Sequence, residues 1–187
     1  MNGESPLDPR PLELPTLPGR NVRLRAFTPE DAGAVQEASW DDLIPLITSV
    51  PSTADHTAAI AFLDRQHARL VTRAGYSFAI ADAASDEAVG QIGLWPREID
   101  QGRASVGYWI RPTARRKGHA ADALATLVDW SRTLPHVHRL ELYVEPWNVG
   151  SWRTAESAGF QREGLLRRWQ SVGGEHRDMY LYSLLPS

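Results

Sequence analysis

Residues 107–121 read GYWIRPTARRKGHAA, and they combine the end of a strand, a basic turn and the start of a helix. The first amides of a helix have no intrahelical acceptor and lie at the positive end of the helix dipole. A phosphate placed there accepts several hydrogen bonds, and Gly118 and Ala120 keep side-chain bulk away from the backbone. The arginines and the lysine of the turn add positive charge. The stretch therefore predicts a site for a phosphate or pyrophosphate group.

The same pattern also fits a plainer interpretation, in which a solvated basic turn opens a surface helix. Two common nucleotide motifs do not fit the stretch. A P-loop has Lys-Ser or Lys-Thr after its glycine, and neither pair follows Gly118. The stretch is not the three-glycine dinucleotide fingerprint either.

Arg115-x-x-Gly118-x-Ala120 resembles the acyl-CoA pyrophosphate signature of the GNAT acyltransferase superfamily. The downstream runs VEPWNVGS at 144–151, ESAGF at 156–160 and EG at 163–164 are similar to its RimJ/RimL-like branch. Members of that branch acylate protein N-termini, and relatives acylate small amines. The resemblance extends from about Arg20 to the C-terminus, and two well-spaced motifs carry it.

The fold that this resemblance implies is α+β, or mixed α/β. A mixed, mostly antiparallel sheet of seven strands is expected to splay near its middle, with about four flanking helices. Acyl-CoA would lie in the split, with the strand at 108–110 along its pantetheine arm. The cofactor-binding residues implied are Trp109, Ile110, Arg115, Arg116, Lys117, Gly118, His119, Ala120, Ala121, Asn148 and Ser151.

Hydrophobic periodicity gives an order of elements that agrees with a sheet covered by helices. The expected strands are 22–26, 76–81, 88–95, 104–110, 139–144, 167–171 and 176–184. Helices are expected after the cap signals that begin at Thr28 and at Ser52, over 119–132, and from Asn148 to Gly159. The apolar face of the second helix is expected to be Ile60, Leu63, Ala68 and Leu70.

Two residues are the candidates for catalysis, Ser151 as the acid and Glu145 as the base. Asn148 and Ser151 stand at the start of a helix, so both also fit simple capping roles. The resemblance adds that Asn148 would contact the pantetheine amides and Ser151 the leaving thiolate. Two family features are absent here. Ala155 replaces a tyrosine acid that many members carry, and Gln170 replaces a glutamate base.

The acceptor amine must lose a proton, because an alkylammonium titrates near pH 10.4, roughly three units above neutrality. Besides Glu145, the bases left open are Glu98, Asp100 and Glu141. The predicted acceptor-binding residues are Trp40, Asp41 and Asp42, since an aromatic ring beside carboxylates attracts a cation. In the alternative interpretation, Trp40 packs against the rest of the protein, and Asp41 and Asp42 are charges at the end of a helix.

The composition is that of an ordinary globular protein: 187 residues, 42% hydrophobic, 23% charged, with a net charge of -3. This charge argues against duplex nucleic acid or an anionic membrane as a partner. Cysteine is absent, and we expect no metal site. A cytoplasmic location is expected, because neither a signal peptide nor a membrane span is evident. A proline-rich arm at 1–19 is expected to precede one domain over 20–187, and a homodimer stays open.

The sequence thus predicts an N-acetyltransferase that moves an acetyl or other acyl group from acetyl-CoA to a primary amine in a ternary complex. The acceptor is either a protein N-terminus or a small molecule. Two other functions fit parts of the pattern. A non-catalytic acyl-CoA sensor would need only the basic turn, and a nucleotide-binding enzyme would use the turn for another diphosphate.

Overall fold

The computed structural model describes residues 14–186. Most of the predicted arm at 1–19 lies outside the described residues. The end of the arm that is described contributes the two-residue strand β1, Leu17–Pro18, which pairs antiparallel with β2. No helix of the described chain is both long enough and apolar enough to cross a membrane.

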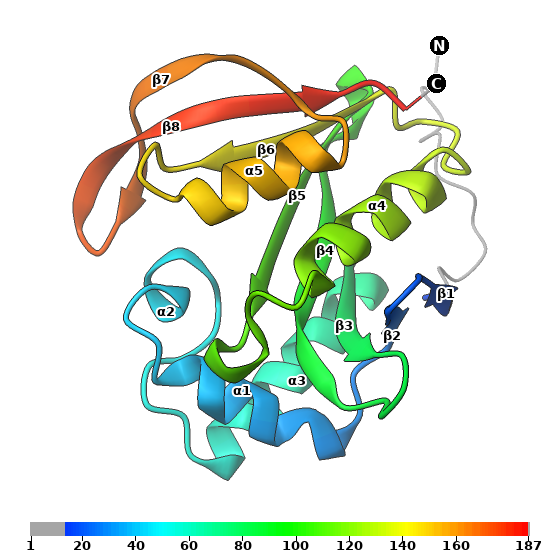
Figure 1. The fold of residues 1–187 in the computed structure, drawn as a ribbon, viewed down its shortest axis with the longest axis vertical. Helices are drawn as coiled ribbons and strands as arrows, with labels where there is room; N and C mark the ends of the chain where they lie inside the picture. The colour runs from blue at the N-terminus through cyan, green and yellow to red at the C-terminus, as the bar shows by residue number, and fades with distance from the viewer. Residues whose placement is uncertain (1–13, 187) are drawn as a thin grey trace, which may run out of the picture.

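One sheet of eight strands forms the centre of the molecule, in the order β1-β2-β3-β4-β5-β6-β8-β7 (Figure 1). All neighbouring pairs are antiparallel except β5 with β6. The predicted fold class is confirmed, and β1 is the strand that the sequence pattern did not indicate. The remaining strands are β2 Val22–Arg25, β3 Tyr76–Asp82, β4 Ala88–Glu98, β5 Arg103–Ile110, β6 Arg139–Val144, β7 Gln161–Val172 and β8 Glu175–Leu184.

Helices cover both faces of this sheet. The α-helices of the described chain are α1 Ala32–Ser39, α2 Ile44–Ile47, α3 His56–Val71, α4 His119–Ser131 and α5 Val149–Ser157. Short 3₁₀ turns are η1 Pro29–Asp31, η2 Ile99–Gln101 and η3 Pro112–Ala114. One core cluster joins α4 to the sheet through Leu124 and Leu127, and a second joins α1 and α3 to the other face through Val35 and Phe62. The two cores therefore lie on opposite sides of β4 and β5.

The helix expected after the signal at Ser52–Asp55 is confirmed as α3, with its cap at the last residue of that signal, but its predicted apolar face is wrong in part. Asp55 caps the helix by accepting a hydrogen bond from the Ala58 amide. Of the predicted face only Leu63 is fully buried, and the other buried residues are Ala59, Phe62 and Gln66. Gln66 is buried because its side chain accepts hydrogen bonds from Ser77 and Gln91 on the sheet. A prediction that counts only apolar side chains cannot identify a buried polar residue of this kind.

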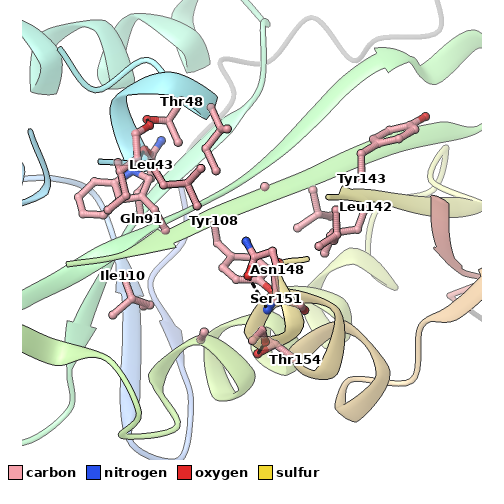
Figure 2. Close-up of a pocket in the computed structure, with 18 of the residues that line it drawn as sticks. Leu43, Thr48, Gln91, Tyr108, Ile110, Leu142, Tyr143, Asn148, Ser151 and Thr154 are labelled. Atoms are coloured by element: carbon pink, nitrogen blue, oxygen red, sulfur yellow. Dashed lines mark hydrogen bonds between the residues drawn. The ribbon is translucent and has the colours of Figure 1, made fainter. Parts of the chain in front are cut away.

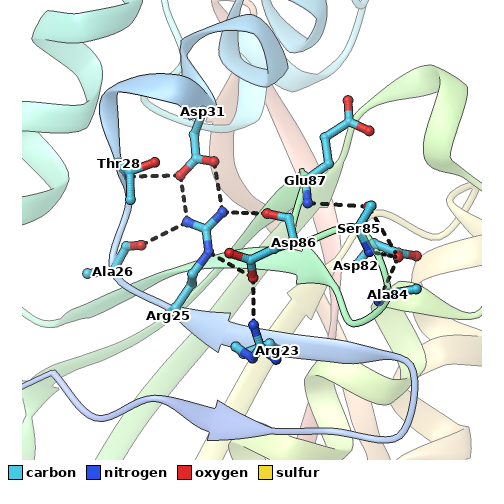
Figure 3. Close-up of polar contacts among 10 residues, drawn as sticks. All are labelled: Arg23, Arg25, Ala26, Thr28, Asp31, Asp82, Ala84, Ser85, Asp86 and Glu87. Carbon is cyan, nitrogen blue, oxygen red and sulfur yellow. Dashed lines mark hydrogen bonds and ion pairs between the residues drawn. The ribbon is translucent and has the colours of Figure 1, made fainter.

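The start of α1 is tied to the sheet by Arg25 (Figure 3). Arg25 donates to both carboxylate oxygens of Asp31, at 2.8 and 3.0 Å, while Asp31 also accepts from the Thr28 amide. The same guanidinium donates to the Asp86 carbonyl in the β3–β4 turn. These contacts raise the pKa of Arg25, chiefly through the hydrogen bond to Asp31. The predicted cap at Thr28 is thus part of a junction between β2, α1 and the β3–β4 turn.

The sheet opens between β5 and β6. The parallel pairing covers only Arg103–Ser105 of β5 with Arg139–Glu141 of β6. Beyond those residues β5 continues to Ile110 beside β4, and β6 continues to Val144 beside β8. The two strands diverge in Figure 1, with α5 beside β6 and α4 in front of β4 and β5. The splay predicted near the middle of the sheet is therefore present.

Candidate active site

A cavity of about 890 Å³ lies where β5 and β6 separate (Figure 2). Its walls come from both faces of the sheet. On the α4 and α5 side they include 118–121 and four of the residues 147–151, and on the α2 and α3 side they include five of the residues 43–49 and Arg69. Strand β5 runs between these two sides, so the cavity connects the faces through the split.

The start of α4 has the geometry of an anion site. Gly118 precedes the helix with φ of 80°, a conformation that favours glycine. The first bond of the turn runs from the Asp122 amide to the Gly118 carbonyl, at 3.1 Å. The amides just before Asp122 therefore have no acceptor within the helix. A Cβ on Gly118 would approach only the Asn21 amide nitrogen, at 3.7 Å, so the turn is open to the cavity.

The basic residues of this turn are not equivalent. Arg115 and Arg116 line the cavity, whereas the Lys117 side chain is not part of the lining. Arg115 is already engaged, since it donates to the Ile110 carbonyl at 3.1 Å and to Asp41 at 2.6 Å. Arg116, with φ of 62°, makes no such ion pair within residues 14–186. Of the two arginines of the turn that line the cavity, Arg116 is thus the one that is available to bind an anion.

Two predicted cofactor-contact residues, Trp109 and His119, line the cavity but have buried side chains. The Trp109 indole is buried in the core beside Phe62, and it donates a 2.7 Å hydrogen bond to Gln91. Only the Trp109 backbone can therefore meet a ligand between β5 and β6. The His119 ring is buried as well, with Nε2 3.3 Å from the Asp82 carboxylate. Ile110, Ala120 and Ala121 line the cavity as well.

The predicted acceptor residues Trp40, Asp41 and Asp42 are not brought to the cavity wall. Trp40 is 77% exposed, and Asp42 is exposed too. Asp41 accepts from the amides of Leu43 and Ile44, both at 3.0 Å, so it starts α2. Burial opposes ionisation of Asp41, but the hydrogen bonds from Ile44, Leu43 and Arg115 lower its pKa overall. The helix-end interpretation of Asp41 agrees with these contacts.

Asn148, Ser151 and Tyr108 come together on the α5 side of the split (Figure 2). The Asn148 side chain caps α5 by accepting from the Ser151 amide at 3.2 Å. The hydroxyl groups of Tyr108 and Ser151 lie 3.1 Å apart, and Tyr108 also donates to the Ser151 carbonyl at 3.1 Å. Burial raises the pKa of Tyr108, while hydrogen bonds with Ser151 and Thr154 oppose that rise. Two hydroxyl donors therefore meet at the point where the strands part.

The carboxylates near the split differ in whether hydrogen bonds or ion pairs hold their side chains. Glu145, which is 9% exposed, is the one carboxylate among the described residues of the cavity lining. Within that described part its side chain has no hydrogen bond or ion pair, unlike Glu141, which is held by Arg139 and Tyr143. Gln170 also lines the cavity. Glu145 thus lies in the cavity lining without a partner among the described residues.

The sequence interpretation missed the contribution of Tyr108 and of Arg69, Trp95 and Arg97, all of which line the cavity. Tyr108 was seen only as part of a strand. Its position beside Ser151 depends on how α5 packs against β5, and no local pattern encodes that. The other three residues come from α3 and β4, far from either motif.

Comparison with known proteins agrees with this geometry. Residues 21–161 match the acetyltransferase (GNAT) domain. The chain is 28% identical over 172 residues to the N-acetyltransferase p20 of Bacillus licheniformis, which covers 92% of this chain and 97% of that protein. RimJ of Mycobacterium smegmatis, in complex with CoA-disulfide, superposes with a TM-score of 0.78 and 26% identity over 92% of this chain and 88% of its own.

A second solved structure is RimL, a ribosomal L7/L12 α-N-protein acetyltransferase in complex with coenzyme A. It superposes with a TM-score of 0.74, covers 91% of this chain and 98% of its own, and at 15% identity supports the fold alone. The chain belongs to the GNAT acetyltransferase family, with the RimJ/RimL-like relationship that its motifs predicted. It is an acyl-CoA-dependent acetyltransferase.

Proposed function

We propose that this protein transfers an acetyl group from acetyl-CoA to a primary amine by direct attack within a ternary complex. The observation that carries the proposal is the cavity through the split, because it opens on both faces of the sheet. One face supplies the free amides of α4 and the other leaves room for an acceptor. The two substrates can therefore meet beside β5 without a covalent enzyme intermediate.

The donor side is assigned from α4 and α5. The backbone amides of 118–121, with Arg116, are suited to the pyrophosphate. Lys117 lies outside the cavity lining, and we assign it with Arg116 to the outer phosphate of the nucleotide. The Asn148 side-chain oxygen caps α5, which leaves its N–H groups to contact the pantetheine arm. In this assignment residues 20–187 form one catalytic domain.

The chemistry is assigned to Ser151, Tyr108 and Glu145. The amine nitrogen attacks the thioester carbon, and the tetrahedral adduct then expels the thiolate of coenzyme A. A hydroxyl that donates a hydrogen bond to the sulfur makes the thiolate a better leaving group. Ser151 is the donor in our proposal, and Tyr108 holds it in place from 3.1 Å. Glu145 accepts the proton that the amine loses.

Incubation of the protein with acetyl-CoA and a panel of amines tests this function. Free thiol is measured against time, and mass spectrometry identifies the acetylated amine. We expect thiol release that depends on the amine and exceeds hydrolysis of acetyl-CoA alone. Tight binding of acetyl-CoA without thiol release for any amine class would instead favour the sensor function.

A further inference from the structure

The end of the cavity on the α3 side is lined by two arginines and by no carboxylate of the described chain. Arg69 comes from the last turn of α3 and Arg97 from β4, and both line the cavity beside Trp95. Glu145 lies at the end of β6, on the other wall of the split. This end of the cavity is therefore cationic, which does not suit a polyamine acceptor.

Trp95 forms the floor of this cationic end, and Gly93 and Gly75 leave room for its ring. A Cβ on Gly93 or Gly75 would lie 2.2 or 2.3 Å from the indole ring. A Cβ on Gly107 of β5 would lie 3.6 Å from the indole nitrogen. The ring therefore covers the sheet surface across β4 and β5, on the face opposite Tyr108.

Arg69 is held in one position over this ring. Its guanidinium carbon lies 4.7 Å from the centroid of Trp95. Its Nε donates to Gln66 at 2.9 Å, and a terminal nitrogen donates to Ser49 at 3.1 Å. All of these partners are neutral. The guanidinium is thus ordered by packing and hydrogen bonds, and its charge is not balanced by any of them.

Arg97 adds a second positive charge that also lacks a counterion. It is exposed, and within residues 14–186 it makes no hydrogen bond or ion pair. Burial lowers the pKa of Arg69, and the charges of Arg97 and Arg65 lower it further. In contrast, Arg25, Arg111, Arg115 and Arg139 each pair with a carboxylate. An anion between Arg69 and Arg97 would relieve the repulsion.

We propose that Arg69 and Arg97 bind a carboxylate of the acceptor, which lies on Trp95 with its amine directed through the split toward Ser151. The inference rests on the proposed function and names its substrate class as an aminocarboxylate. The geometry supports this direction, since Gly107 faces Trp95 and the next residue, Tyr108, contacts Ser151. Successive residues of a strand point to opposite faces, so anion and amine lie on opposite sides of β5.

The test compares acceptors that differ only in a remote carboxylate, so that the amine keeps its own pKa. One pair is 5-aminopentanoate and 5-aminopentanamide, and a second is the dipeptide amides Ala-Glu and Ala-Gln. The first pair tests a free small molecule and the second a peptide N-terminus. We expect kcat/KM to favour the acid by about tenfold or more in at least one pair, as for hydrogen bonds to a charged group.

Two variants assign the preference to the arginines. In Arg97→Gln we expect the ratio of kcat/KM for acid over amide to fall toward one. Arg65→Gln removes the same charge from α3 at a residue outside the cavity lining, and we expect it to keep the wild-type ratio. Arg69→Lys retains the positive charge but loses the planar guanidinium, which can donate two hydrogen bonds to one carboxylate. We expect its ratio of kcat/KM for acid over amide to lie between those of the wild-type protein and Arg97→Gln.

The outcomes separate this inference from the proposed function. Equal rates for acid and amide in the wild-type protein, or the same ratio in Arg97→Gln, would overturn the carboxylate site while transfer stands. If no amine is acetylated, the proposed function fails. In that case the Ala-Glu peptide is titrated into CoA-saturated protein by calorimetry. Binding that is weaker in Arg97→Gln than in the wild-type protein supports the carboxylate site, and absence of binding overturns it.

Discussion

The hydroxyl groups of Ser151 and Tyr108 share one hydrogen bond at 3.1 Å, and either oxygen can be its donor. Because Tyr108 also reaches the Ser151 carbonyl, its own proton has an alternative acceptor. When Tyr108 instead donates to the serine hydroxyl oxygen, the serine proton is free to point into the cavity. At the scale of single residues, whether Ser151 acts only at the start of the helix or also as an acid therefore depends on its hydrogen bond with the Tyr108 phenol.

Ser151→Ala separates chemistry from binding. If Ser151 supplies the proton donor, turnover falls by about 10²-fold or more, the usual range for general acids. Affinity for acetyl-CoA is expected to stay nearly unchanged, and stability to fall by about 1 kcal/mol or less. Turnover and affinity are measured on the same folded preparation. Unchanged turnover would leave Ser151 with a structural role only.

Tyr108→Phe tests whether the phenol positions Ser151. We expect turnover to fall by about fivefold, because the loss of one hydrogen bond of roughly 1 kcal/mol lets the serine rotate. The matched control is Tyr182→Phe, which removes the hydrogen bond from a buried tyrosine to Glu156 away from the cavity. Equal effects of both variants on turnover would contradict the positioning role and indicate a general loss of stability.

The sequence predicted Ser151, Asn148 and the Gly118 turn because each lies in a local motif whose spacing alone sets its geometry. Tyr108 and Arg69 lie in no such motif, and their roles arise from contacts over long stretches of chain. The sequence could not decide between the acceptor and the helix-end interpretations of Asp41 for a related reason. Its carboxylate caps the four-residue α2, an element too short to be seen from periodicity.

At the scale of elements, α4 presents its N-terminus to the cavity and α3 presents its last turn. The two helices lie on opposite faces of the sheet, so the donor and acceptor ends are built independently. A change at the start of α4 should therefore act on the donor without altering the acceptor end.

Gly118→Asp places a carboxylate at the start of α4. We expect affinity for acetyl-CoA to fall at least tenfold, about 1.4 kcal/mol, because the new charge repels the pyrophosphate. Gly174→Asp is the matched control, since Gly174 has a positive φ of 83° with open space around it in the β7–β8 turn. Calorimetry on both variants gives the comparison. Normal binding by folded Gly118→Asp would show that the phosphates bind elsewhere.

At the scale of the whole molecule, Glu163 joins the three C-terminal strands. From β7 it accepts hydrogen bonds from Arg139 on β6 and from Ser183 on β8. These hydrogen bonds lower the pKa of Glu163 from 4.5 to about 2. A carboxylate with a lowered folded-state pKa stabilises the protein above its unfolded pKa, and that contribution is lost as the pH falls.

Glu163→Gln should therefore change the acid stability of the fold. In the wild-type protein we expect the free energy of unfolding to decrease between the ordinary pKa of 4.5 and about 2. The variant should be less stable near neutral pH and should show a weaker decrease over that range. The side chain is 42% exposed, so the effect is expected to be modest. Denaturant unfolding at several pH values measures it, and parallel curves would contradict the assignment.

The whole fold was largely predictable, because the strand periodicity and two motifs agree on the same architecture. The predicted strands lie within one residue of those observed, except that β4 extends three residues further and β7 begins six residues earlier. What the sequence could not show is which face each helix covers, as the burial of Gln66 on α3 illustrates. The cationic end of the cavity follows from that packing, and so it too required the structure.

The unpaired length of β5 has a further consequence for solubility. A strand without a neighbour exposes backbone groups that other chains can pair with, which is a common route to aggregation. Beyond Ser105 that edge faces the cavity, between α5 and α2, and not the outer surface of the molecule. The outer edge strand, β7, instead carries Arg162, Arg167 and Arg168, and such charges discourage edge-to-edge association. A protein with a sheet opened at its centre can thus remain dispersed.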